Sequence, residues 1–171
     1  SRSPRWRHIR PSHSDQKDLE MLQEHPIDVS VTIPRTPDEI WQYVENIESH
    51  VAWMKDAHAI RFTSDIHKGV GTTFECDTKI GPFRLIDKME ITEWEPGRVM
   101  GVRHQGIVSG RGQFSLTSSG ENQTTFRWAE SLKFPWFLGS RLGALVARPI
   151  LRRIWLGNLR RLKAVFENTS P

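Results

Sequence analysis

The sequence contains a single cysteine, Cys76, among its 171 residues. One cysteine excludes a disulfide within the chain and a cysteine metal cluster, and this composition is typical of the reducing cytoplasm, where we expect the protein to work. No apolar run approaches the ~20 residues that a membrane-spanning helix needs. Residues 1–13 are polar and basic, and they lack the apolar centre of a secretory signal.

Sequence motifs for nucleotides and metals are also missing. Gly69 and Gly71 occur without the rest of a dinucleotide-binding fingerprint, and the chain has no phosphate-binding loop. The seven histidines are scattered, and no two have a spacing typical of zinc ligands. We therefore expect no cofactor and no metal. The sequence has no internal repeat, and its length suits one domain with a tail.

The net charge of +4 is unevenly distributed. Residues 136–171 carry seven Lys/Arg against one acidic residue, whereas residues 26–135 carry 12 basic against 15 acidic residues. A nucleic-acid-binding domain is more often basic across one whole face, so nucleic acid is not a favoured partner. The basic residues near the C-terminus are typical of a solvated helix face, although peripheral contact with an anionic membrane stays open.

The first 25 residues are rich in Arg, Ser, Pro and His, a composition that does not fold alone. We expect a mobile N-terminal extension over residues 1–25 and a folded domain over residues 26–168. The domain opens with Ile27 to Ile33, which alternates apolar and polar residues as a half-buried strand does. Thr36 to Glu39 then matches a capping box, which predicts a helix, and residues 48–54 predict a second short helix.

A long β region follows. Apolar residues alternate with polar ones along several runs between His58 and Phe134, and turns rich in glycine and proline separate the runs. Six or seven strands joined by tight turns predict an antiparallel meander.

The last long segment, Pro149 to Glu167, has an apolar stripe at helical spacing. The stripe before it is out of phase, and the phase changes at Arg148-Pro149, where proline favours a break. We therefore expect the main helix to begin at this point, with Trp136–Ala147 as a gate. The stripe of the main helix consists of Leu151, Trp155, Leu159, Leu162 and Phe166.

Three stretches resemble the START/Bet-v-1-like (SRPBCC) helix-grip superfamily, and within it the polyketide cyclase/dehydrase and lipid transport group. They are VTIPRTPDEIWQYVENIESHVAWM, KMEITEWEPGRVMGVRH and the closing LRRIWLGNLRRLKAVFE, so the resemblance covers about Ile27 to Phe166. It implies an α+β fold in which a curved antiparallel sheet grips the C-terminal helix, with a ligand cavity between them. It says less about function, because superfamily members include lipid carriers, cyclases, receptors and co-chaperones.

Strand alternation indicates which side chains face such a cavity. His104 shares a face with Met100 and Val102, and Glu130 shares one with Trp128. Glu130 and His104 are the strongest candidate pair for a functional role. Catalysis, contact with a ligand and structural pairing all stay open for them. Asp87 alone favours a structural role, and His58, Thr72, Cys76 and Thr78 are weaker inward candidates. The ligand-binding candidates are Phe74, Leu85, Asp87, Met89, Met100, His104, Phe126, Trp128, Glu130 and Trp155.

Three functions compete. The leading hypothesis is a non-enzymatic protein, monomeric or homodimeric, that binds or transports a hydrophobic small molecule such as a lipid, isoprenoid or polyketide. The second is a cyclase or dehydratase that uses Glu130 and His104 as acid and base. The third is a module that docks on RNA, ribosome or membrane through Arg152, Arg153, Arg160, Arg161 and Lys163.

Overall fold

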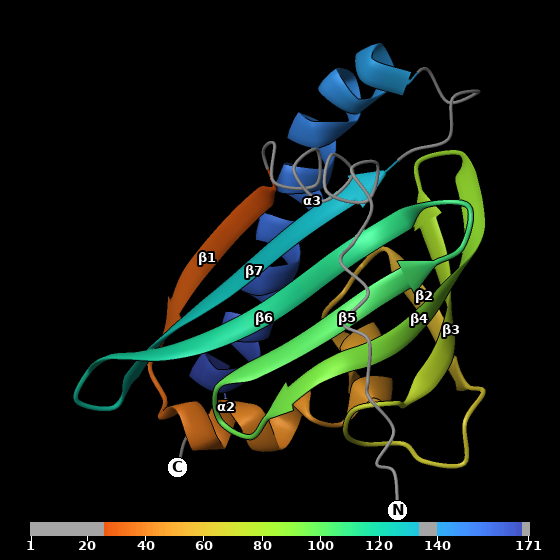
Figure 1. Ribbon diagram of the computed structural model, residues 1–171. Helices are drawn as coiled ribbons and strands as arrows, with labels where there is room; N and C mark the ends of the chain where they lie inside the picture. The colour runs from red at the N-terminus through yellow and green to blue at the C-terminus, as the bar shows by residue number, and fades with distance from the viewer. Residues whose placement is uncertain (1–25, 134–139, 169–171) are drawn as a thin grey trace, which may run out of the picture.

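The computed structural model describes residues 26–133 and 140–168, with the side chains of the last helix from Ala147 onward. One antiparallel sheet of seven strands has the order β1-β7-β6-β5-β4-β3-β2. It curves around one long helix (Figure 1). The elements are β1 (Ile27–Ile33), α2 (Pro37–Val44), the 3-10 helix η1 (Ile47–Ala52), β2 (Ala57–Phe62), β3 (Thr73–Ile80), β4 (Phe83–Glu95), β5 (Val99–Gln105), β6 (Ser109–Gly120), β7 (Gln123–Lys133) and α3 (Ser140–Asn168).

The first strand and helix form as their sequence predicts. The side chains of β1 alternate between buried and exposed apart from one half-buried position. The side chain of Thr36 accepts a hydrogen bond from the backbone N–H of Glu39, and Glu39 Oε2 accepts one from Thr36 N at 2.8 Å. This capping box satisfies free N–H groups at the start of α2 and confirms the prediction.

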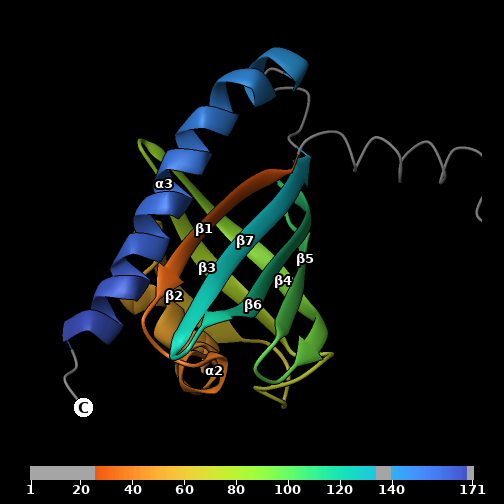
Figure 2. The same cartoon turned by 90° about the vertical axis from the view of Figure 1, so that its left-hand side faces the viewer.

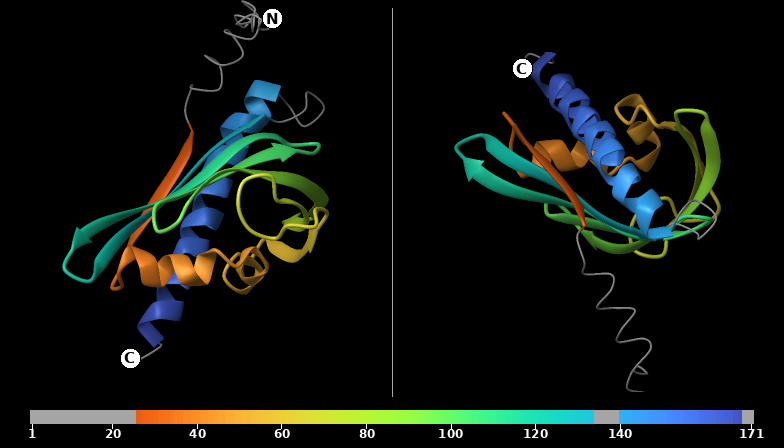
Figure 3. Two further views of the ribbon diagram at one scale, coloured as in Figure 1. Left: turned by 60° about the horizontal axis from the view of Figure 1, so that its bottom comes forward. Right: turned by 90° about the horizontal axis from the view of Figure 1, so that it is seen from above.

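The meander is also confirmed, because each strand from β2 to β6 pairs with the next one along the chain. Two of its tight turns need glycine: Gly81 and Gly97 have φ values of +57° and +74°, which side-chain-bearing residues rarely adopt. The remaining strand, β1, pairs with β7 and completes one edge of the sheet. Figure 3 shows α3 lying in the hollow of the curved sheet, so the predicted α+β helix-grip fold is confirmed.

The predicted start of the last helix is wrong. Helix α3 runs through Pro149 and begins at Ser140, nine residues before the expected break. Proline removes one backbone hydrogen bond but does not have to end a helix, and the N-terminal turns of α3 project beyond the sheet (Figure 2). Of the expected gate, residues 140–147 belong to α3 and residues 136–139 lie outside the described residues, as does the expected extension over residues 1–25.

The expected stripe of α3 packs against the sheet. Leu159 and Leu162 are fully buried, and Leu151, Trp155 and Phe166 are exposed by 8% or less. Arg152, Arg153 and Arg160 are exposed on the other side, as expected of a solvated face. Within the described residues, no helix is long and apolar enough to cross a membrane.

A polar contact within this apolar stripe fixes α3 against the segment after η1. Asn158 is fully buried; its Oδ1 accepts a hydrogen bond from Lys55 N at 3.0 Å, and its Nδ2 donates to Asp56 Oδ1 at 2.6 Å. Arg161 Nε donates to the carbonyl oxygen of Trp53 at 3.0 Å. Because buried polar groups are costly without partners, these bonds specify where α3 lies along the sheet.

Candidate functional site

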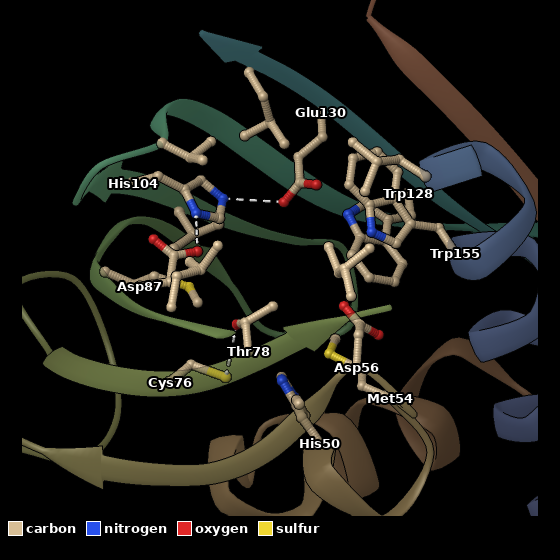
Figure 4. A pocket seen from close by; sticks show the side chains of 18 of the residues that line it. His50, Met54, Asp56, Cys76, Thr78, Asp87, His104, Trp128, Glu130 and Trp155 are labelled. Carbon is tan, nitrogen blue, oxygen red and sulfur yellow. Dashed lines mark hydrogen bonds and ion pairs between the residues drawn. The ribbon is translucent and has the colours of Figure 1, made fainter. Parts of the chain in front are cut away.

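A cavity of about 590 Å³ lies between the concave face of the sheet, η1 and α3 (Figure 4). Its volume is in the range typical of small-molecule sites. Polar side chains interrupt its wall at a few points only. The apolar wall includes Ile47, Ile60, Phe74, Leu85, Met89, Ile91, Met100, Val102, Phe114, Trp128, Leu132, Leu151 and Trp155.

All the candidate site residues except Phe126 line this cavity. Phe126 faces the same side of the sheet but is fully buried, with its ring 5.3 Å from that of Phe114 and 6.5 Å from that of Trp53. Alternation identifies the face correctly, but Trp53, the residue after η1, packs over the sheet at this position. Trp128, two residues further along β7, does line the cavity and stacks on Trp155 at 5.1 Å.

Three side chains from different strands form a continuous polar cluster in the wall. His104 Nδ1 lies 2.7 Å from Asp87 Oδ2, and His104 Nε2 lies 3.0 Å from Glu130 Oε1. The three residues are exposed by 8% or less. An imidazole between two carboxylates donates from both nitrogens when it is protonated. The predicted pair of Glu130 and His104 is therefore in direct contact, and Asp87 is a third member of the cluster (Figure 4).

Glycines on the intervening strand allow this contact. On β6, Gly110 is paired with His104 and Gly112 is paired with Glu130. A Cβ atom at Gly112 would lie 2.7 Å from Glu130 Oε1 and 2.8 Å from its Cγ, closer than real Cβ atoms approach. Because β6 carries no side chain at these positions, His104 of β5 and Glu130 of β7 reach each other across it.

The cluster holds a proton tightly on the imidazole. Burial alone would lower the pKa of His104, but its hydrogen bonds to Asp87 and Glu130 and the charges of both carboxylates raise it to about 10. Burial raises the pKa of Glu130 above its usual range, although the hydrogen bond and charge of His104 oppose this. The negative charge of Asp87 also acts to raise the pKa of Glu130, because one imidazolium balances only one of the two buried carboxylates.

The cluster retains unused hydrogen-bonding capacity. Both nitrogens of His104 are occupied, whereas Asp87 Oδ1 is buried and has no partner in the described part of the chain. Glu130 Oε2 likewise has no hydrogen bond among the described residues, and Glu130 lines the cavity. The arrangement can therefore accept a hydrogen bond from a bound molecule at Glu130, or exchange a proton with it.

A second histidine lines the opposite part of the cavity. His50 Nε2 donates to the carbonyl oxygen of Val44 at 2.7 Å, and its ring packs beside Trp53 and Phe114. Burial lowers the pKa of His50 to about 4, and the bond to Val44 opposes this only in part, so the imidazole is neutral at pH 7. Sequence reasoning missed His50 and the neighbouring lining residue Asp56, because neither lies on a strand where alternation applies.

Of the four weaker inward candidates, two line the cavity and two do not. Cys76 and Thr78 line the cavity, and Thr78 Oγ1 donates to Cys76 Sγ at 3.7 Å. Burial raises the pKa of the Cys76 thiol to about 11, so it is not an activated nucleophile. Thr72 is buried but lies outside the lining, and His58 is exposed, so their expected positions are wrong. A bulge between Ala57 and Ala59 shifts the register at His58.

No group of three His, Cys, Asp or Glu side chains is arranged to hold a metal ion in residues 26–133 or 147–168. In the polar cluster, both ring nitrogens of His104 are already engaged by carboxylate oxygens.

The sequence matches the profile of the family "Polyketide cyclase / dehydrase and lipid transport" over residues 24–167. The chain belongs to this family. No match was found among curated proteins. Membership agrees with the resemblance seen in the sequence and with a cavity of ligand-binding size.

Solved structures similar to this family member share its fold. A START superfamily protein from Mycobacterium smegmatis aligns with a TM-score of 0.72 and 10% identity over 85% of this chain and 99% of its own. The protein TTHA0849 from Thermus thermophilus aligns with a TM-score of 0.69 and 14% identity, over 86% of this chain and 100% of its own. The Zhui aromatase/cyclase from Streptomyces sp. R1128 aligns with a TM-score of 0.65 and 13% identity, over 84% of this chain and 93% of its own.

Proposed function

We propose that this protein binds, and in doing so can carry, a hydrophobic small molecule such as a lipid, isoprenoid or polyketide. The observation that supports this function best is the cavity of about 590 Å³, with a mainly apolar wall and one polar cluster. Such a combination binds an apolar body and orients one polar end. Burying about 200 Å² of apolar ligand surface would contribute roughly 5 kcal/mol before the costs of binding.

The residues divide between these two tasks. Trp128 and Trp155 stack on each other and present wide apolar surfaces, and Met89 and Met100 adapt easily to irregular shapes. The cluster of Asp87, His104 and Glu130 is the polar end. Its internal bonds hold the Glu130 carboxylate in place, so little orientational freedom is lost when a ligand binds there.

A neutral fluorescent probe, N-phenyl-1-naphthylamine, tests this proposal together with native mass spectrometry of the purified protein. Met89→Trp adds bulk inside the cavity, and Ile86→Trp adds an indole on the same strand at a position that is 51% exposed and outside the lining. We expect saturable binding of one probe by the wild type and by Ile86→Trp, and binding at least about tenfold weaker by Met89→Trp. Equal binding by both variants, or no binding by the wild type, would contradict the proposal.

A second candidate function is acid/base catalysis in the same cavity. The observation in its favour is the direct contact of 3.0 Å between His104 Nε2 and Glu130 Oε1 beside open cavity space. In this scheme Glu130 accepts a proton from a bound polyketide-like substrate, and the His104 imidazolium stabilises the charge that results. Turnover of a model poly-β-ketone that is lost in Glu130→Gln, with probe binding retained, would support catalysis over carriage alone.

Docking on RNA, ribosome or membrane through the basic side of α3 is not part of this proposal. Arg161 of the expected docking set bonds to the Trp53 carbonyl oxygen inside the fold, and Lys163 pairs with Glu167 at 3.5 Å. The exposed Arg152, Arg153 and Arg160 point away from the cavity stripe of the same helix.

A further inference from the structure

The polar groups of the cavity indicate which chemical end of a ligand they would accept. Three carboxyl-bearing side chains line the cavity: Asp87 and Glu130 in the cluster, and Asp56 nearer to η1. The cationic lining residues are His104, whose nitrogens are both occupied, and Arg84, which is exposed at the rim. The interior is therefore rich in acceptors and has no free cation among the described residues.

Two carboxyl groups have oxygens available to a ligand. Glu130 is exposed by only 6%, and its Oε2 has no hydrogen-bond partner in the described part of the chain. Asp56 Oδ1 accepts a bond from Asn158, which leaves its second oxygen without one among the same residues. In Figure 4 both carboxyl groups point toward the part of the cavity beside Trp128 and Trp155.

The two indoles supply neutral donors to the same space. Figure 4 shows the indole nitrogens of Trp128 and Trp155 on the side of the rings that faces Glu130. An indole N–H donates and cannot accept, whereas Glu130 Oε2 accepts. A group that lies between them must therefore both accept and donate a hydrogen bond. A hydroxyl group does both, a carboxylate only accepts, and an ammonium group only donates.

Charge leads to the same choice. A carboxylate or phosphate beside Glu130 would lie in a buried space where both nitrogens of His104 are occupied, and the other cationic lining residue, Arg84, is exposed to solvent. An ammonium group could pair with Glu130, but it would leave the indole donors without an acceptor and would lose its own hydration on burial. A neutral hydroxyl avoids both costs.

We propose that the ligand of this cavity is an apolar molecule whose polar end is a neutral hydroxyl group, an alcohol or a phenol, bound between Glu130 and the indoles of Trp128 and Trp155. This inference rests on the proposed function and deepens it. Glu130 is then the residue that determines specificity, and Asp87 and His104 position it through the hydrogen bonds already described.

Competition among three ligands of equal chain length tests the inference. Decanol, decanoate and decylamine each displace N-phenyl-1-naphthylamine from the wild-type protein at pH 8. We expect decanol to displace the probe at a concentration at least about tenfold lower than decanoate. This corresponds to a difference of about 1.4 kcal/mol in binding free energy. We also expect decanol to act at a lower concentration than decylamine. Decanoate or decylamine acting as well as decanol would overturn the inference.

Two substitutions assign the selectivity to Glu130. Glu130→Gln removes the carboxylate, so the preference for decanol over decanoate should fall several-fold. Asp77→Asn removes a carboxylate of the outer face, where Asp77 pairs with Arg61, and should leave the preference unchanged. An unchanged preference in Glu130→Gln would overturn the role of Glu130. Failure of the probe itself to bind the wild type would instead contradict the proposed function, so the two failures are distinguishable.

Discussion

The two buried histidines of the cavity are nearly equal in exposure and opposite in charge. His50 is 6% exposed and His104 is 7% exposed. His50 donates to a backbone carbonyl and has its pKa lowered to about 4, mainly by burial. The same burial would lower the pKa of His104, yet its two carboxylate partners raise this pKa to about 10. Burial alone therefore does not determine the charge of a side chain, because the partners decide it.

This difference divides the cavity into a neutral part and a charged part. The part around His50, Trp53 and Phe114 has aromatic rings in contact, and its histidine is neutral at pH 7. The charged part has an imidazolium that holds two carboxylates in fixed positions. A ligand with an apolar body and one polar end matches such a division, which is why the two histidines are informative about function.

Replacing His104 should have the largest effect on stability. His104→Leu leaves the Asp87 and Glu130 carboxylates buried without their shared cation. We expect the free energy of unfolding at pH 7 to fall by about 3–5 kcal/mol, the cost typical of breaking a buried ion pair. Urea denaturation of His104→Leu and of His104→Leu/Glu130→Gln measures this. The double variant should recover part of the loss, and a loss below about 1 kcal/mol in the single variant would contradict the description of the cluster.

The pH dependence of stability should separate the two histidines. The pKa of His50 is lower in the folded state than in the unfolded state. Its contribution to the free energy of unfolding is therefore fully present above about pH 6.5, and about 3 kcal/mol is lost as the pH falls toward 4. The pKa of His104 is higher in the folded state than in the unfolded state. Its contribution to the free energy of unfolding is therefore fully present below about pH 6.5 and is lost as the pH rises toward 10.

Urea denaturation from pH 4 to pH 10 checks both signs. His50→Gln should flatten the acid side of the stability profile and leave the alkaline side as in the wild type. His104→Gln should flatten the alkaline side only. A wild-type protein that gains stability between pH 7 and pH 10 would disagree with the charge assigned to His104.

A smaller effect is expected from filling the gap on β6. Gly112→Ala places a Cβ against Glu130 Oε1, so Glu130 must move and its contact with His104 must lengthen. We expect a loss of about 1–3 kcal/mol in the free energy of unfolding. Gly120→Ala on the same strand is the matched control, because the nearest atom to its Cβ would be Gln123 Oε1 at 3.6 Å. Equal losses in both variants would indicate a general effect of the strand.

The fold was predictable because its signals are local. Alternation in β1, the capping box at Thr36 and the stripe of α3 each depend on residues close in sequence, and each is present in the structure. The start of α3 was not predictable in this way. Whether Pro149 ends a helix depends on what surrounds the preceding turns, and the sequence does not contain that information in local form.

The candidate site was predictable in part for the same reason. Alternation places His104 and Glu130 on the inner face, but the contact between them depends on Gly110 and Gly112 of β6, whose register with both neighbours sequence alone does not specify. Those glycines are the signal that could have pointed to the contact. Phe126 was misplaced because its contact with Trp53, far away in the sequence, is a tertiary feature.

The central claim, that a charged cluster forms the polar end of the cavity, is tested most directly by NMR of the histidine side-chain nitrogens. Spectra of the uniformly ¹⁵N-labelled protein are recorded from pH 4 to pH 10.5. His104 should show two protonated nitrogens at pH 7 and titrate near 10, while His50 stays neutral at pH 7 and titrates near 4. Decanol should shift the His104 signals, because it binds at Glu130. A His104 that titrates near 6.5 and does not respond to decanol would contradict the claim.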